Sequence, residues 1–185
     1  NPKDDNAYHN RGVSRESLGK CYEAISDYMK AIEIKADRPT SYHGIGYCKS
    51  ELSDFEGAII AFSKAIELDP KFADAYYNRG DAKSNLKDNF GAISDYTKVI
   101  EIDPQNKDAY LNRGFEKDEI KDYYGAISDY TKAIEIDPND TSAFKNRSIA
   151  KEMIGDIEGA CLDARKSVSL GDTASDNQTW IKDNC

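Results

Sequence analysis

The sequence has no long hydrophobic run. None of its apolar stretches reaches the roughly 18 residues that a membrane-spanning helix requires, so we expect no membrane insertion. Basic side chains are in short supply, since 25 lysines and arginines face 34 aspartates and glutamates and leave a formal net charge of -9. This balance disfavours nucleic acid and anionic membranes as partners, because both repel an acidic protein. It favours a soluble chain with basic or neutral partners.

Catalytic and cofactor motifs are also missing. The sequence contains no glycine-rich phosphate loop, no nucleophile elbow and no HExxH motif. The two histidines, His9 and His43, occupy equivalent positions of a repeat. Without a fixed carboxylate or cysteine beside them, they make a weak metal site. We therefore expect no catalytic residues, no metal and no cofactor, and a protein that is not an enzyme.

What the sequence does contain is a 34-residue repeat without insertions or deletions. It is marked by five alanines: Ala24, Ala58, Ala92, Ala126 and Ala160. Counting from them gives five repeats, residues 5–38, 39–72, 73–106, 107–140 and 141–174. Each repeat holds two stretches of helical length with apolar residues at helical spacing, and strand patterns are absent. The sequence therefore predicts an all-α protein.

Turn and packing residues recur at fixed positions of the repeat. An aspartate that suits a helix N-cap precedes the second stretch (Asp54, Asp88, Asp122 and Asp156), and Asp-Pro ends that stretch in repeats two to four. One position of the first stretch holds a small residue: Gly12, Gly46, Gly80, Gly114 and Ser148. We expect this residue to face the recurring alanine, so that the two helices cross closely. Aromatic residues at two further positions should fill the space between repeats.

Three of the four cysteines lie at repeat positions. Cys161 stands where the other repeats have isoleucine, and neither Cys21 nor Cys48 has a CxxC partner. We predict that these three pack in the core, rather than binding zinc or forming a disulfide. Cys185 lies beyond the repeats and has no interpretation from spacing. The cysteines do not identify the cellular compartment of the protein, and we slightly favour the cytoplasm over export.

This series of residues resembles the tetratricopeptide repeat (TPR). The resemblance covers residues 5–174 and is weakest in the fifth repeat, where Asp172 replaces the proline and Ala164 an aromatic residue. It implies a right-handed superhelical solenoid of antiparallel helix pairs, with ligands in a concave groove lined by the first helices. Residues 175–185, which include Trp180, are expected to form a C-terminal capping helix.

Arginine at one position of the repeat always occurs together with aspartate at a second position. Four repeats have both, sixteen residues apart: Arg11 and Asp27, Arg79 and Asp95, Arg113 and Asp129, and Arg147 and Asp163. The second repeat has neither, with Ile45 and Ala61 in their places. The planar guanidinium suits a partly buried carboxylate, and losing one partner would strand a charge. We therefore predict structural ion pairs, within one repeat or between neighbours, rather than an anion site.

Asparagine recurs on the expected groove. The sixth position of the repeat reads Asn10, Gly44, Asn78, Asn112 and Asn146. An amide side chain both donates and accepts hydrogen bonds, which is what an extended peptide backbone requires. An equally weighted alternative is that these amides only bond a neighbouring helix.

The other groove positions are mostly acidic. They include Tyr77 and the aspartates Asp74, Asp81, Asp108 and Asp118, together with a few glutamates, against one lysine, Lys145. A concave surface lined by one sign of charge focuses its potential. We therefore predict a non-enzymatic scaffold that binds an extended, basic or neutral peptide of a protein partner. The alternatives are a self-associating array, hence a homo-oligomer, and the targeting module of a larger enzyme.

Overall fold

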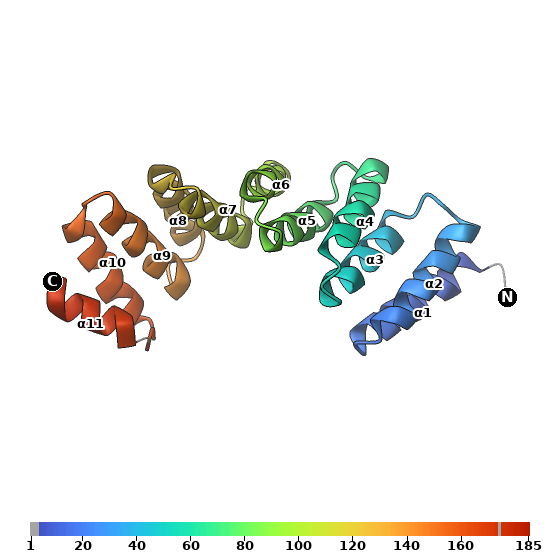
Figure 1. Ribbon diagram of the computed structural model, residues 1–185, viewed down its shortest axis with the longest axis horizontal. Helices are drawn as coiled ribbons and strands as arrows, with labels where there is room; N and C mark the ends of the chain where they lie inside the picture. The colour runs from blue at the N-terminus through green and yellow to red at the C-terminus, as the bar shows by residue number, and fades with distance from the viewer. Residues whose placement is uncertain (1–3, 174) are drawn as a thin grey trace. The chain divides into compact units, whose positions relative to one another are not determined.

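The computed structural model describes residues 4–173 and 175–185, with no side chains described for 175–177. These residues form eleven α-helices and no strand (Figure 1). The helices are α1 (Asp5–Ser17), α2 (Cys21–Ile34), α3 (Pro39–Glu51), α4 (Phe55–Leu68), α5 (Ala73–Asn85), α6 (Asn89–Ile102), α7 (Lys107–Glu119), α8 (Tyr123–Ile136), α9 (Thr141–Met153), α10 (Ile157–Ser169) and α11 (Ser175–Asn184). The predicted all-α fold of helix pairs is confirmed. No helix in the described ranges is both long and apolar enough to cross a bilayer.

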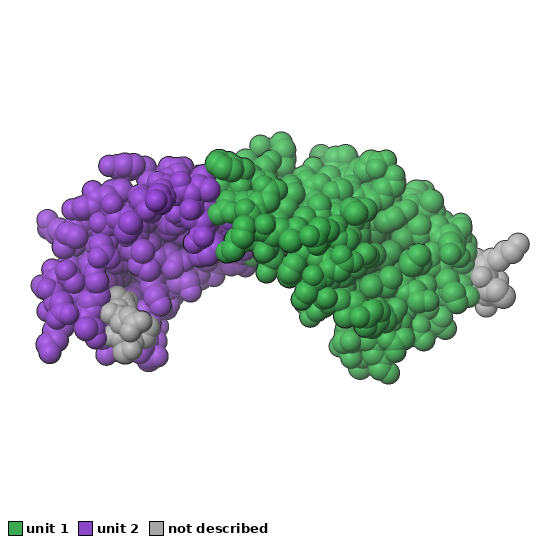
Figure 2. Space-filling model, in the orientation of Figure 1, with its two compact units in different colours: residues 1–102 green, residues 103–185 purple. Residues whose placement is uncertain are grey.

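The chain forms two compact units, Asn1–Ile102 and Asp103–Cys185 (Figure 2). Unit 1 holds three helix pairs, and unit 2 holds two pairs and α11. In every pair the first helix packs on the second. Within each unit the second helix also packs on the next first helix, as α2 does on α3 and α8 on α9.

Aspartate side chains start the second helices. Asp54, Asp122 and Asp156 precede α4, α8 and α10, and each accepts a hydrogen bond from the backbone N–H three residues later at 2.9–3.0 Å. Asp88 does the same before α6. These carboxylates satisfy donors that the first turn leaves unpaired, so the predicted N-caps are confirmed.

The recurring glycine makes room for an aromatic ring. A Cβ atom added to Gly80 would lie 2.8 Å from the ring of Tyr96, on the second helix of the same repeat. The same holds for the other glycines of this position, which face Tyr28, Phe62 and Tyr130. In the fifth repeat both partners change, to Ser148 and Ala164. The ring, rather than the recurring alanine that we expected, is therefore the nearest neighbour of the glycine.

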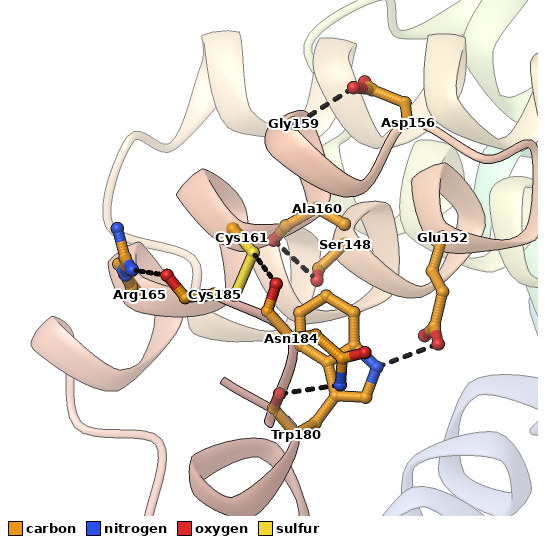
Figure 3. Close-up of a disulfide and its surroundings, with 10 residues drawn as sticks. All are labelled: Ser148, Glu152, Asp156, Gly159, Ala160, Cys161, Arg165, Trp180, Asn184 and Cys185. Carbon is orange, nitrogen blue, oxygen red and sulfur yellow. Dashed lines mark hydrogen bonds between the residues drawn. A yellow bond between two sulfur atoms is a disulfide. The ribbon is translucent and has the colours of Figure 1, made fainter. Parts of the chain in front are cut away.

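The C-terminal helix α11 packs on α10 and is fastened to it by a disulfide between Cys161 and Cys185 (Figure 3). Cys161 is buried, but the prediction that it forms no disulfide was wrong. Comparing repeats could not reveal the bond, because Cys185 follows α11 and lies outside the repeats. Trp180 Nε1 donates a hydrogen bond of 2.8 Å to Glu152 Oε1 at the end of α9 (Figure 3).

The other two cysteines are free and buried, as predicted. Cys21 and Cys48 belong to an apolar cluster that also contains Tyr28 and Ile45. Burial raises the pKa of the Cys48 thiol, so this sulfur stays protonated and unreactive at neutral pH.

Candidate functional site

The first helices of successive repeats lie next to each other within each unit. In unit 1, α1 contacts α3 and α3 contacts α5; in unit 2, α7 contacts α9. We call the surface that they share in each unit the first-helix face. Cavities open on it in both units, with about 220 Å³ between α3 and α5 and about 280 Å³ between α7 and α9. Most of the residues that line them come from first-helix positions that the sequence assigned to the groove, and the others are aromatic residues of α4 and α8.

The asparagine of the third repeat is bonded to a neighbouring helix. Asn78 Nδ2 lies 2.8 Å from His43 Nε2 and donates to it. The His43 ring packs against Phe62 and Phe72, with centroids 5.5 and 4.9 Å apart. Burial lowers the pKa of His43, which keeps the ring neutral and able to accept. Asn78 therefore fits the alternative that we weighed equally, although its amide oxygen stays available.

The other predicted residues of unit 1 differ in how far the fold engages them. Asn10 and Asp74 are exposed on α1 and α5. The Tyr77 ring meets the Tyr96 ring at 5.7 Å, and the Tyr96 hydroxyl donates to Asp81 Oδ1 at 2.7 Å. Asp81 is thus partly engaged in the fold, whereas Asn10 and Asp74 face solvent.

In unit 2 the predicted residues divide in the same way. Asp108 is exposed near the start of α7, with Lys107 Nζ 3.9 Å away. Asn112 lies partly buried further along α7, and Asn146 of α9 lines the 280 Å³ cavity. The Tyr130 hydroxyl donates to Asp118 Oδ2 at 2.7 Å. Asp118 therefore both supports the fold and lines the cavity.

The carboxylate of Asp118 is only half satisfied. Its Oδ1 atom is buried and has no hydrogen-bond partner among the described residues. Burial raises the pKa of Asp118, the hydrogen bond from Tyr130 opposes this rise, and the nearby carboxylates of Glu119 and Asp122 add to it. Sequence reasoning treated Asp118 as one acidic residue among several, because the burial of one oxygen atom leaves no signal in a sequence.

Each predicted arginine lies against the aspartate of its own repeat. Arg79 Nη2 and Nε donate to the two oxygens of Asp95 at 2.6 and 2.9 Å. Arg147 does the same to Asp163 at 2.7 and 2.8 Å. The pairs Arg11 with Asp27 and Arg113 with Asp129 have the same geometry. All four aspartates are buried, so the bidentate contact neutralises a carboxylate inside each of these four helix pairs.

A second cation completes each pair, and sequence reasoning missed it. Lys83 Nζ lies 2.7 Å from Asp95, and Arg15, Lys117 and Lys151 make the equivalent contacts at 2.6–2.8 Å. All five repeats have a basic residue here, which was a readable signal. In the second repeat, which has no aspartate to meet, Lys49 turns instead to Asp54 at 2.7 Å.

The second repeat replaces this polar network by an apolar hollow. Elsewhere the arginine also reaches the preceding repeat, since Arg79 donates to Ser63 at 2.9 Å and Arg147 to Thr131 at 3.0 Å. At the junction of repeats one and two the three positions are Met29, Ile45 and Ala61. All three line a cavity of about 810 Å³ that also contains Ile25, Ile32, Ile59 and Ile60. We call it the α2–α4 hollow.

The histidines do not come together as a metal site. His9 Nδ1 lies 2.9 Å from Ser41 Oγ, while His43 meets Asn78. Within the described residues no group of three or more histidine, cysteine, aspartate or glutamate side chains could hold a metal ion.

Repeated antiparallel helix pairs with a glycine-to-ring contact define a helical-repeat protein. The tetratricopeptide-repeat model matches residues 5–38, 73–106 and 107–140, and a second model, described as TPR repeat, matches residues 50–87. The chain belongs to the tetratricopeptide-repeat family, and the resemblance seen in the sequence is confirmed. Members of this family generally act as scaffolds for protein–protein interaction, not as enzymes.

Solved structures share the fold. The crystal structure of MamA protein is 24% identical with a TM-score of 0.85, covering 90% of this chain and 91% of that chain. YrrB, described as a TPR protein with an unusual peptide-binding site, is 21% identical with a TM-score of 0.87, covering 98% and 94%. A MamA chain from Desulfovibrio magneticus RS-1 is 20% identical with a TM-score of 0.85, covering 92% and 97%. No curated relative matches the sequence.

Proposed function

We propose that this chain is a non-enzymatic scaffold that binds an extended, basic or neutral peptide segment of a protein partner on its first-helix face. The observation that carries the proposal is the pair of cavities between successive first helices, each lined by asparagine and acidic side chains. The peptide-binding site described for YrrB, a structure with the same fold, supports the same use of this one.

Amide and carboxylate side chains have different roles in the proposed binding. Amide groups at Asn10, Asn78, Asn112 and Asn146 can bond the peptide backbone, which every sequence offers. At Asn78 the amide oxygen is the group that would accept a hydrogen bond from the peptide, because the amide nitrogen already donates to His43. The exposed carboxylates Asp74 and Asp108 attract a basic segment from a distance, an effect that salt weakens.

An array of extended decapeptides with basic, neutral and acidic composition tests the proposal. Binding to the full chain would be measured at about 50 and 200 mM salt, a range over which the Debye length shortens markedly. We expect basic and neutral peptides to bind, basic ones more weakly at high salt, and Asp74→Asn with Asp108→Asn to reduce the salt dependence. Preference for acidic peptides, or no loss of affinity in Asn146→Ala, would contradict the mechanism.

Self-association is a second candidate, and the α2–α4 hollow favours it. Met29 and Ile60 at this hollow are among the exposed large apolar residues, and apolar surface of this kind is a common protein contact. Sedimentation at increasing concentration would show the oligomer, and Ile60→Glu should shift it toward monomer. Asp74→Asn on the other face serves as the control. A mass that stays monomeric at all concentrations excludes this candidate.

A further inference from the structure

We propose that the cavity between α7 and α9 takes the side chain of a lysine from the bound peptide. The inference rests on the proposed function and deepens it, because it names the residue that the first-helix face selects. It combines three observations on this cavity: its size, its apolar wall and the unpaired carboxylate oxygen beside it.

The size and the wall fit one long side chain. A volume of about 280 Å³ falls just short of the ~300–1,000 Å³ typical of small-molecule pockets. Phe115, Ile149 and Met153 line it and are 46%, 48% and 56% exposed, so their apolar surface is uncovered. A lysine buries its four methylene groups along such a wall while its ammonium reaches a polar group.

The polar side of the cavity is acidic and favours a cation. Asp118 and Glu119 both line the cavity, and none of the described residues that line it is basic. Asp118 Oδ2 accepts from Tyr130, whereas Oδ1 is buried without a donor. An ammonium at Oδ1 would supply the missing hydrogen bond and neutralise a carboxylate that burial makes costly to ionise.

Lysine fits this position better than arginine. A guanidinium binds a carboxylate best through both oxygens, and one oxygen of Asp118 is taken by Tyr130. An ammonium is a point charge that needs a single acceptor. Oδ1 is shielded from water, so the ammonium must displace part of the rim, and Met153 is unbranched and flexible enough to turn aside.

The cavity of unit 1 offers a comparison within the same molecule. It lies between α3 and α5 and has Ser50 at the position of Asp118. The Oγ atom of Ser50 is also buried without a partner, but a hydroxyl carries no charge. Glu51 and Asp81 line the unit 1 cavity, but of these two cavities only that of unit 2 has a buried carboxylate oxygen without a donor at this wall position.

Nuclear magnetic resonance of the full chain, labelled at the methyl groups of isoleucine and methionine, tests the lysine site directly. The probes are Nα-acetyl-lysine methylamide and its norleucine and arginine counterparts. We expect saturable shifts at Ile149 and Met153 with the lysine probe, and weaker or absent shifts with the other two. Asp118→Asn, which keeps the shape and the bond to Tyr130, should weaken lysine binding about tenfold or more.

Glu16→Gln is the matched control. Glu16 holds the same repeat position in unit 1 and accepts a hydrogen bond from Tyr28 at 2.6 Å, but it does not line the cavity. This variant should bind the lysine probe like the parent chain. Equal shifts with norleucine, or unchanged binding in Asp118→Asn, would overturn the lysine site. Peptides that bind without preferring lysine would overturn it while leaving the scaffold intact, whereas an array with no binder at all refutes the proposed function itself.

Discussion

Exchanging Arg79 and Asp95 for isoleucine and alanine, the residues of the second repeat, measures how strongly this pair ties two helices together. Asp95 is 2% exposed and meets Arg79 at 2.6 and 2.9 Å and Lys83 at 2.7 Å. Asp95→Ala strands two cations, so we expect a loss of about 3–5 kcal/mol in the free energy of unfolding. Arg79→Ile leaves Lys83 as a partner and should cost about 1.5–3 kcal/mol.

The double variant should cost less than the sum of the two single variants, by about 1–3 kcal/mol, because the lost bonds between Arg79 and Asp95 are counted in both single variants and Arg79 is no longer left without its partner. Urea unfolding followed by circular dichroism gives the free energies, and hydrogen exchange in α5 and α6 shows where stability is lost. The control cycle uses Lys98 and Glu101, which are 2.6 Å apart but 50% and 56% exposed. Their coupling should be close to zero, because water solvates both charges. If Arg79 and Asp95 couple no more strongly than this exposed pair, the buried network does not stabilise the repeat.

Three further changes should have defined effects. Gly80→Ala places a Cβ 2.8 Å from the Tyr96 ring and should lower stability by about 1–3 kcal/mol, seen as a lower Tm. Hydrogen bonds from Arg11 lower the pKa of Asp27, so its stabilising contribution is present above pH ~4 and is lost as pH falls through the folded-state pKa. The unfolding free energies of the parent and Asp27→Asn should therefore converge in acid. Cys185→Ser, or reduction, opens a loop with a sequence separation of 24 and should cost up to about 3 kcal/mol, with faster hydrogen exchange in α10 and α11.

Each of these expectations has a contrary result. An unchanged Tm for Gly80→Ala would mean that the ring yields to a methyl group. A constant difference between the parent chain and Asp27→Asn from pH 7 to pH 2 would show that this carboxylate adds nothing through its charge. Equal exchange in α11 with and without reductant would show that packing on α10 holds this helix without the disulfide.

Much of the fold could be predicted from the sequence because the same helix pair occurs five times. A residue that recurs every 34 positions has a recurring neighbour, so the N-cap at Asp54 and its equivalents was readable without coordinates. Departures from the repeat were equally informative. The second repeat has Ile45 and Ala61 at the two positions where the third has Arg79 and Asp95, and this joint change indicated that the two positions are in contact. The sequence shows which positions vary together, but it did not reveal that Gly80 faces the ring of Tyr96, because this pair of positions changes in the fifth repeat alone, to Ser148 and Ala164.

The site was less predictable, for a physical reason. Whether a polar side chain is available depends on its neighbours in other helices. Asn78 meets His43 across two first helices, and Asp118 meets Tyr130 within a helix pair. Spacing alone does not reveal such contacts. Tyr130 and Asp118 are twelve residues apart, as are Tyr28 and Glu16, which are also hydrogen-bonded, but the sequence does not show which of these polar groups is buried. Asn78 and Asp118 therefore looked as accessible as Asn10 and Asp108, which are exposed. The disulfide escaped for a similar reason, because Cys185 has no counterpart in the repeats.

Because α11 covers α10, it affects whether molecules can stack end to end. α11 packs on α10 as α9 packs on α8, so it occupies the side of the last repeat on which another repeat would stack. Stacking of identical molecules end on end is a heterologous contact that does not close, and it leads to filaments. The Cys161–Cys185 bond holds α11 in this place on α10. A single sulfur–sulfur bond therefore helps to keep this stacking surface covered.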